Sequence, residues 1–227
     1  MKKKIEIIFN ILIDVFVIIG LVVMFTYNSE DNELVSHGIE NFKYFTVLSN
    51  VFCGIVAFIQ LICDIISKSS NDYVQEENSQ KNQKKYIKII KYLKLIATTD
   101  VALTFCTVAF FLWPIYKMAG MYQGSNFFFH LIVPLLAIID FCLIDEGIKI
   151  PFKITIISIL PSIIYGAAYL ANILINGIGK WPDSNDWYGY LNWGYPVGIL
   201  IFAVTTVMTW IMSAVLWKLN KRFMQDR

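Results

Sequence analysis

Thr46 and His130 are the two residues of this sequence whose types and positions could make a nucleophile and its general base. A threonine hydroxyl attacks a carbonyl only when a neighbouring group takes its proton, and neutral histidine is suited to that role near neutral pH. Thr46 is three residues beyond Lys43 and His130 is four beyond Asn126. In helices that rise about 1.5 Å per residue, both therefore lie about one turn below the same surface. We predict a catalytic pair here, the alternative being a structural hydrogen bond at each position.

Other residues compete with this pair or could support it. His37 is a second possible base, and Ser49 and Thr26 are other hydroxyls. Ser49 could also border the cleft that holds Thr46. The oxyanion of an attacked ester needs hydrogen-bond donors, and the candidates are a backbone N–H and the side chains of Asn50, Asn126 and Asn172.

The elements that must position these residues are apolar runs with one polar or small face. Residues spaced by three and four share a face of a helix, and three runs keep this spacing. Such faces turn away from lipid, either toward one another or toward a water-filled cavity. They comprise Thr46, Asn50, Cys53, Ala57, Gln60 and Asp64; Asn126, His130, Val133, Ala137 and Asp140; and Ser158, Ser162, Tyr165, Tyr169, Asn172 and Asn176.

Ionisable residues also occur inside the apolar runs. Asp14, Asp100 and Asp140 lie there, and an ionisable group within a membrane is costly and marks function by default. Their role is left open by the sequence. Asp64 is followed four residues later by Lys68, a spacing that predicts an ion pair on one helix.

The composition places all these residues in a membrane. Of the 227 residues, 57% are hydrophobic and 16% are charged, against about 25% charged in ordinary soluble domains. Since about 30 Å of hydrocarbon needs a helix of about 20 apolar residues, we predict six spans, at 5–27, 44–66, 93–116, 127–144, 153–175 and 196–217. The fold class is therefore all-α, a single six-helix transmembrane domain covering residues 1–227.

The lysines and arginines predict the orientation. With the N-terminus in the cytoplasm, 16 of the 19 fall inside and three fall outside (Lys43, Lys117 and Lys180). Both termini are thus expected to be cytoplasmic, in a multi-pass protein of the cell membrane. The stretch 67–91 is polar, basic and free of Pro and Gly, which predicts a cytoplasmic linker. The outer loop 176–195 is rich in Trp and Tyr, and is either an interfacial aromatic belt or a lid over a site.

The sequence offers no cofactor or metal site. It contains no phosphate-binding or dinucleotide-binding glycine motif and no CxxC or HExxH pair, and two histidines are too few for a zinc centre. The formal charge of +2 does not indicate nucleic acid as a partner. The expected partners are membrane lipids and a lipid ester, with protein partners left open.

Three stretches resemble the androgen-induced-gene family of six-helix membrane hydrolases. FKYFTVLSN at 42–50 is similar to the segment that opens the family's second span, and NFFFHLIVPLLAIID at 126–140 to the segment that opens its fourth. KWPDSNDWYGYLN at 180–192 is loosely similar to an aromatic segment before the last span. The resemblance implies an esterase acting on fatty acid esters of hydroxy fatty acids, with Thr46 as nucleophile and His130 as its histidine.

Two other classes of function remain open at this stage. A small ion- or proton-coupled transporter would use Asp14, Asp100 and Asp140, and six spans could form two inverted repeats of three. However, residues 5–116 and 127–217 show no convincing similarity to each other. A membrane partner protein without catalytic activity is the remaining alternative.

Overall fold

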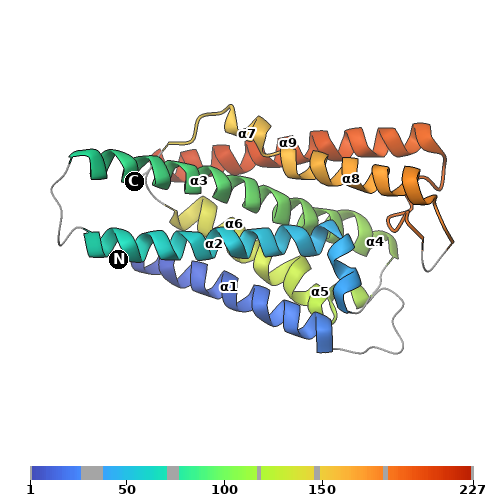
Figure 1. The fold of residues 1–227 in the computed structure, drawn as a ribbon, viewed down its shortest axis with the longest axis horizontal. Coiled ribbons are helices and arrows are strands. Elements are labelled where there is room, and N and C mark those ends of the chain that lie inside the picture. Colours follow the sequence, from blue (N-terminus) through green and yellow to red (C-terminus); the bar gives the residue numbers. More distant parts are fainter. Residues whose placement is uncertain are drawn as a thin grey trace.

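Six helices long and apolar enough to cross a membrane run alongside one another in a computed structural model of the chain (Figure 1). It describes residues 2–26, 38–70, 77–116, 119–145, 149–180 and 184–225, and these ranges contain no strand. The predicted all-α six-helix membrane protein is confirmed. The candidate spans are Lys3–Thr26, Phe45–Ile66, Lys85–Leu112, Ser125–Ile144, Ile154–Asn176 and Tyr195–Met224.

Several spans are built from more than one helical element. The elements are α1 (Lys2–Thr26), η1 (Gly38–Lys43), α2 (Phe45–Ser70), α3 (Glu77–Cys106), η2 (Thr107–Leu112), α4 (Trp113–Tyr116), η3 (Ala119–Tyr122), α5 (Ser125–Phe127), η4 (Phe128–Ile132), α6 (Val133–Ile139), η5 (Asp140–Ile144), α7 (Ile154–Ile157), α8 (Leu160–Asn176) and α9 (Tyr195–Gln225). The segments η2, η4 and η5 are π-helical, whereas η1 and η3 are 3-10 helices.

The linker predicted at 67–91 is mostly helical. α2 continues to Ser70 and α3 begins at Glu77, so residues 71–76 alone lie outside the described helices. This stretch contains no Pro or Gly and many good helix formers, so both helices extend beyond the apolar runs. For the same reason α9 extends to Gln225, beyond the predicted end at 217.

Prolines lie beside three of the points where the described helices become irregular, whereas the π-helical segment η5 has no proline in it or directly after it. A proline ring clashes with the carbonyl four residues earlier and cannot donate a hydrogen bond. Pro134 follows η4, in which the Val133 amide bonds the Phe128 carbonyl five residues back. Pro114 follows η2 in the same way, and Pro161 lies just after the break between α7 and α8. Because His130 is four residues before Pro134, it lies in such a π-helical turn.

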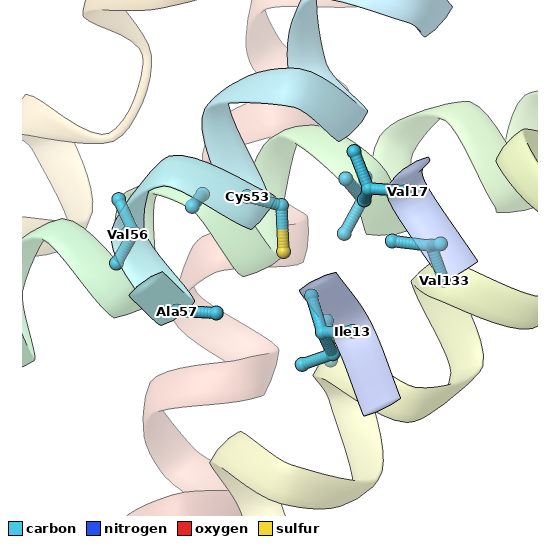
Figure 2. Packing of buried hydrophobic residues seen from close by; sticks show 9 residues of the cluster. Ile13, Val17, Cys53, Val56, Ala57 and Val133 are labelled. Atoms are coloured by element: carbon cyan, nitrogen blue, oxygen red, sulfur yellow. The ribbon is translucent and has the colours of Figure 1, made fainter. Parts of the chain in front are cut away.

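One core joins α1, α2, α3 and α6. It consists of Ile13, Val17, Cys53, Val56, Ala57, Ala97, Val101, Val133 and Ala137, and Figure 2 shows Ile13 of α1 opposite Cys53 and Ala57 of α2. A Cβ atom on Gly54 would lie 3.3 Å from Val17 Cγ1, so the missing side chain lets α1 and α2 approach closely, as small residues do in membranes.

A second core joins α3, η5, α7 and α9 and contains Leu95, Ala102, Phe141, Cys142, Ile150, Ile154 and Leu216. α8 packs beside α9, at the side of the bundle away from α1 (Figure 1). α1 begins and α9 ends at the same end of the bundle (Figure 1), as an even number of crossings requires. The opposite end, where α2 and α9 begin and α8 ends, carries a cavity of about 760 Å³.

Candidate active site

A cavity of about 760 Å³ opens among the start of α2, the end of α3 with η2, the η3–η4 segment, α8 and the start of α9. Thr46 and His130 both line it. On α9 its wall runs from Tyr195 to Thr206, so at about 1.5 Å per residue the lined part of this helix is about 16 Å long. The structure therefore brings the two residues of the predicted pair to one cavity, from helices that are far apart in sequence.

Thr46 is the second residue of α2, and its neighbours fix the first turn of that helix. The Phe45 amide donates to Tyr188 Oη at 2.9 Å. The Val47 and Leu48 amides both bond the Tyr44 carbonyl, at 3.2 and 3.3 Å. The remaining amide of this first turn belongs to Thr46 itself, at the end of a helix where N–H groups have no intrahelical partner.

His130 is 8% exposed and its ring is held by one contact from η3. Its Nδ1 lies 2.6 Å from the Met121 carbonyl oxygen. Because a carbonyl can only accept a hydrogen bond, Nδ1 carries the hydrogen, and in the neutral ring Nε2 is then the nitrogen with a free lone pair. This is the tautomer that a general base needs, with a backbone carbonyl in the orienting role that a carboxylate fills in the Ser-His-Asp arrangement.

Asn50 joins the two sides of the site but does not line the cavity. Its Nδ2 donates to the Thr46 carbonyl at 2.7 Å and to the Phe129 carbonyl at 3.0 Å. Phe129 directly precedes His130, so one buried amide connects the backbone of both members of the pair. Since both N–H groups of Asn50 are engaged, this residue is a positioning residue rather than an oxyanion donor.

The other predicted supporting residues fall in different places. Asn126 lines the cavity and donates to the Gly120 carbonyl at 3.0 Å. Asn172 does not line it and donates to Asn185 Oδ1 at 3.0 Å. Ser49 is buried behind the wall, where its Oγ donates to the Thr46 carbonyl at 3.0 Å. The competing base His37 lies outside the described residues, and Thr26 is exposed on α1.

Residues 184–194 of the outer aromatic loop form part of the cavity wall, and we call them the aromatic cap. Trp187, Tyr188, Tyr190 and Leu191 line the cavity, and Trp187 Nε1 donates to Tyr165 Oη at 3.0 Å. The Trp193 side chain is 71% exposed and does not line the cavity. Whether the loop is an interfacial belt or a lid stays a prediction.

A buried carboxylate organises the aromatic cap. Asp186 is 6% exposed and accepts hydrogen bonds from Tyr169 Oη, the Tyr190 amide at 2.9 Å and the Leu191 amide at 2.8 Å. Burial, together with the charge of Asp186, raises the pKa of Tyr190 to about 12. Burial also raises the pKa of Tyr188 well above its usual value. These phenols therefore stay neutral at physiological pH.

The three intramembrane aspartates are not part of this cavity. Asp140 is fully buried, and its Oδ2 lies 2.7 Å from Lys94 Nζ. Asp100 is 1% exposed, and neither of its carboxyl oxygens has a hydrogen-bond partner among the described residues. Asp14 is partly buried on α1 and forms no ion pair with any described side chain.

Lys94 and Glu6 are central to an ionic network that the sequence did not reveal. Lys94 Nζ also lies 3.4 Å from Glu6 Oε1, and Lys3 Nζ lies 3.1 Å from Glu6 Oε2. Asp64 pairs with Lys3 at 2.8 Å, and the side chain of its expected partner Lys68 lies outside the described residues. The lysine count alone placed Lys94 in the cytoplasm, whereas in the structure it is buried among helices.

Within the described ranges, no group of three or more His, Cys, Asp or Glu residues is arranged to hold a metal ion. Comparisons of the chain with protein-family models, with curated proteins and with solved structures find no match. The functional argument therefore depends on the residues and the geometry of the cavity.

Proposed function

We propose that this protein is an intramembrane esterase that hydrolyses fatty acyl esters. Thr46 Oγ1 attacks the ester carbonyl while His130 Nε2 takes its proton, and the histidine returns that proton to the leaving alcohol. In the second step water, activated by the same nitrogen, attacks the acyl-threonine. The acid is released and the threonine hydroxyl is restored.

The observation that carries this proposal is a cavity of about 760 Å³ lined by both Thr46 and His130. The bond from His130 Nδ1 to the Met121 carbonyl supports it, because it leaves Nε2 as the basic nitrogen. The apolar part of the wall, which includes Leu103, Val108 and Phe202, suits an acyl chain.

Two donors are available for the oxyanion. The Thr46 amide lies in the first turn of α2, where the helix dipole favours negative charge. Asn126 lines the cavity and uses one of its two amide hydrogens on Gly120. Loss of one such donor typically costs about 3 kcal/mol in kcat.

The proposal also covers the orientation of the protein in the membrane and the family to which it belongs. The cavity would lie at the outer end of the bundle in the cell membrane, with both termini in the cytoplasm, because 16 of the 19 lysines and arginines fall on the other side. Membership of the androgen-induced-gene family of threonine hydrolases, on the resemblance of 42–50 and 126–140, gives Thr46 and His130 the same two roles.

Labelling with a fluorophosphonate probe tests the nucleophile. We expect purified wild-type protein to be labelled and the Thr46→Ala variant not to be. Thr26→Ala is the matched control, because Thr26 is an exposed threonine of α1 that does not line the cavity, and it should be labelled like the wild type. Labelling that survives Thr46→Ala would reject this nucleophile, and full turnover in His130→Ala would reject this base.

A second candidate function is proton-coupled transport, and Asp100 is the observation that favours it. Its carboxyl group is buried without a partner among the described residues, which is costly unless the group has a role. Asp140 fits this role less well, because it is paired with Lys94. Proton flux into proteoliposomes that is abolished by Asp100→Asn and unaffected by Thr46→Ala would favour transport over hydrolysis.

A further inference from the structure

The described wall of the cavity carries no formal charge. Its polar side-chain groups are the hydroxyls and amides of Thr, Ser, Asn and Tyr residues, the indole of Trp187 and the imidazole of His130, and none of its described residues is Asp, Glu, Lys or Arg. A ligand that carries a carboxylate or a phosphate would therefore meet no counter-ion among the described residues that line this wall. Lys43, whose Nζ lies 5.5 Å from the centre of the Tyr44 ring, is not one of them. A charge that leaves water without a partner costs several kcal/mol.

A buried carboxylate lies directly behind part of the wall. Asp186 lies under the aromatic cap, bonded to the Tyr169 hydroxyl and to the Tyr190 and Leu191 amides, and no described basic side chain forms an ion pair with it. Tyr169, Tyr190 and Leu191 all line the cavity, so a single layer of residues separates this carboxylate from a ligand in the cavity. Its field disfavours a second anion there.

The remaining wall suits the rest of a neutral amphipathic ester. Near Thr46 and His130 the wall includes the polar residues Asn126 and Ser125, four and five residues before His130 in the chain. Along α8 and α9 apolar residues such as Leu170, Ile173 and Phe202 alternate with the hydroxyl groups of Ser162, Thr205 and Thr206. The wall is thus suited to an uncharged ester with hydrocarbon chains, and none of its described side chains carries a charge that could pair with an ionised end.

We propose, building on the esterase function, that the cavity selects fatty acyl esters whose alcohol and acyl portions are both uncharged, and that it discriminates against substrates with a free carboxylate. The substrate class differs from the one that the family resemblance implies, since a fatty acid ester of a hydroxy fatty acid ends in a carboxylate. The discrimination comes from a lining without counter-ions and from Asp186 behind it.

Ligand binding without turnover tests this selectivity. Trp187 lines the cavity, and brominated acyl chains quench tryptophan fluorescence on contact. The Thr46→Ala protein in nanodiscs would be titrated at pH 9 with 9,10-dibromostearic acid or with its methyl ester, and the quenching that persists in a Thr46→Ala/Trp187→Phe protein would be subtracted. We expect half-maximal quenching of Trp187 at a methyl ester concentration at least about tenfold lower than that of the acid. Equal or tighter binding of the acid, or no quenching by either compound, would overturn the proposal.

A charge placed in the wall should reverse the preference. Leu112 lines the cavity at the end of η2, close enough to the helix end for a lysine to reach water. In Leu112→Lys the acid should gain at least about fivefold in affinity relative to the methyl ester, whereas Leu112→Gln, of similar length and uncharged, should keep the wild-type ratio. An unchanged ratio in Leu112→Lys would count against the proposal.

Turnover then separates this inference from the esterase function itself. Wild-type protein would be given a fatty acid ester of a hydroxy fatty acid and, separately, the same compound with its carboxylate capped as a methyl ester. We expect kcat/KM to be at least about tenfold higher for the capped compound. Equal hydrolysis of both would overturn the charge selectivity and leave the esterase function standing. Hydrolysis of neither would reject the esterase function, and the quenching ratio would still decide the selectivity of the cavity.

Discussion

The ion pair between Lys94 and Asp140 allows a quantitative test of how the helices pack. Lys94 Nζ is 2.7 Å from Asp140 Oδ2 and 3.4 Å from Glu6 Oε1, and the three side chains are 7%, 0% and 5% exposed. Lys94→Met keeps most of the side-chain volume and removes the charge. Asp140 then has no ion-pair partner among the described residues, whereas Glu6 keeps Lys3 at 3.1 Å.

The expected loss follows from this asymmetry. Removing one member of a buried ion pair costs about 3–5 kcal/mol, because the other charge stays buried and uncompensated. We therefore expect Lys94→Met to lower the free energy of unfolding by about 3–5 kcal/mol. Lys153→Met is the matched control, since Lys153 is exposed and forms no ion pair with a described side chain, and its effect should stay within about 0.5 kcal/mol.

The double variant Lys94→Met/Asp140→Asn isolates the pair. Replacing both members of a buried pair is often nearly neutral, so the double variant should recover most of the loss, with a coupling free energy of at least about 2 kcal/mol. Unfolding would be followed by titration with a denaturing detergent and by labelling of the buried thiol of Cys142, which is 5% exposed in the folded protein. Simple addition of the two single-variant losses would refute the reasoning, because it would mean that the two charges do not interact.

Three further perturbations address the site and its cap. Asn50→Ala removes the amide that connects the two sides of the active site. We expect kcat for ester hydrolysis to fall by about tenfold or more, with a smaller change in KM. A rise in KM with kcat unchanged would contradict this. Gly166→Ala places a methyl group against the Phe202 ring and should lower the free energy of unfolding by about 1–3 kcal/mol. Adding Phe202→Leu to the same chain should recover part of this loss. Thermal unfolding in detergent measures the single and the double variant. Since burial raises the pKa of Tyr190 to about 12, against about 10 for an unfolded tyrosine, the unfolded chain releases this proton first, and stability should fall as the pH rises from about 10 to 12. Tyr190→Phe should remove that part of the decline, and an identical decline in this variant would show that other groups cause it.

The six helices could be predicted from the sequence because each apolar run is long enough to cross a bilayer. Their ends could not, because α3 and α9 continue into water on residues that favour helix but are not apolar. Hydropathy records where the membrane ends, whereas helix propensity and the absence of Pro and Gly decide where the helix ends.

The meeting of Thr46 and His130 on one cavity follows from features that the sequence contains. Each residue lies one turn below the same end of the bundle, which fixes its depth. Each also lies on the polar face of its helix, which fixes the side of the helix that it occupies. The role of Asn50 was not foreseen, because it depends on the Phe129 carbonyl of another helix coming within 3.0 Å. Such contacts depend on the order and rotation of the packed helices, which spacing along one chain does not specify.

The same limit explains the ionic network. Asp64 and Lys68 are four residues apart, so the sequence favours their pairing, yet Asp64 bonds Lys3 of α1 at 2.8 Å. Lys94 adds to the positive-inside count whether it faces water or protein. A single run of residues cannot distinguish a lysine at the membrane surface from one that holds Glu6 and Asp140 between helices.

The ionic network around Lys94 and the cavity around Thr46 and His130 differ in how many of their polar groups already have partners. This difference favours the cavity as the reactive site. At the end of the bundle where α1 begins, Lys94 and Lys3 each form ion pairs with two carboxylates. These ion pairs connect α1, α2, α3 and η5. At the capped end, His130 uses Nδ1 on a carbonyl and keeps Nε2 free, and Thr46 lines a space large enough for a substrate. A catalytic group must be held in place and still have an atom free to react. Among the described residues, those beside the aromatic cap meet both conditions and also leave room for a ligand.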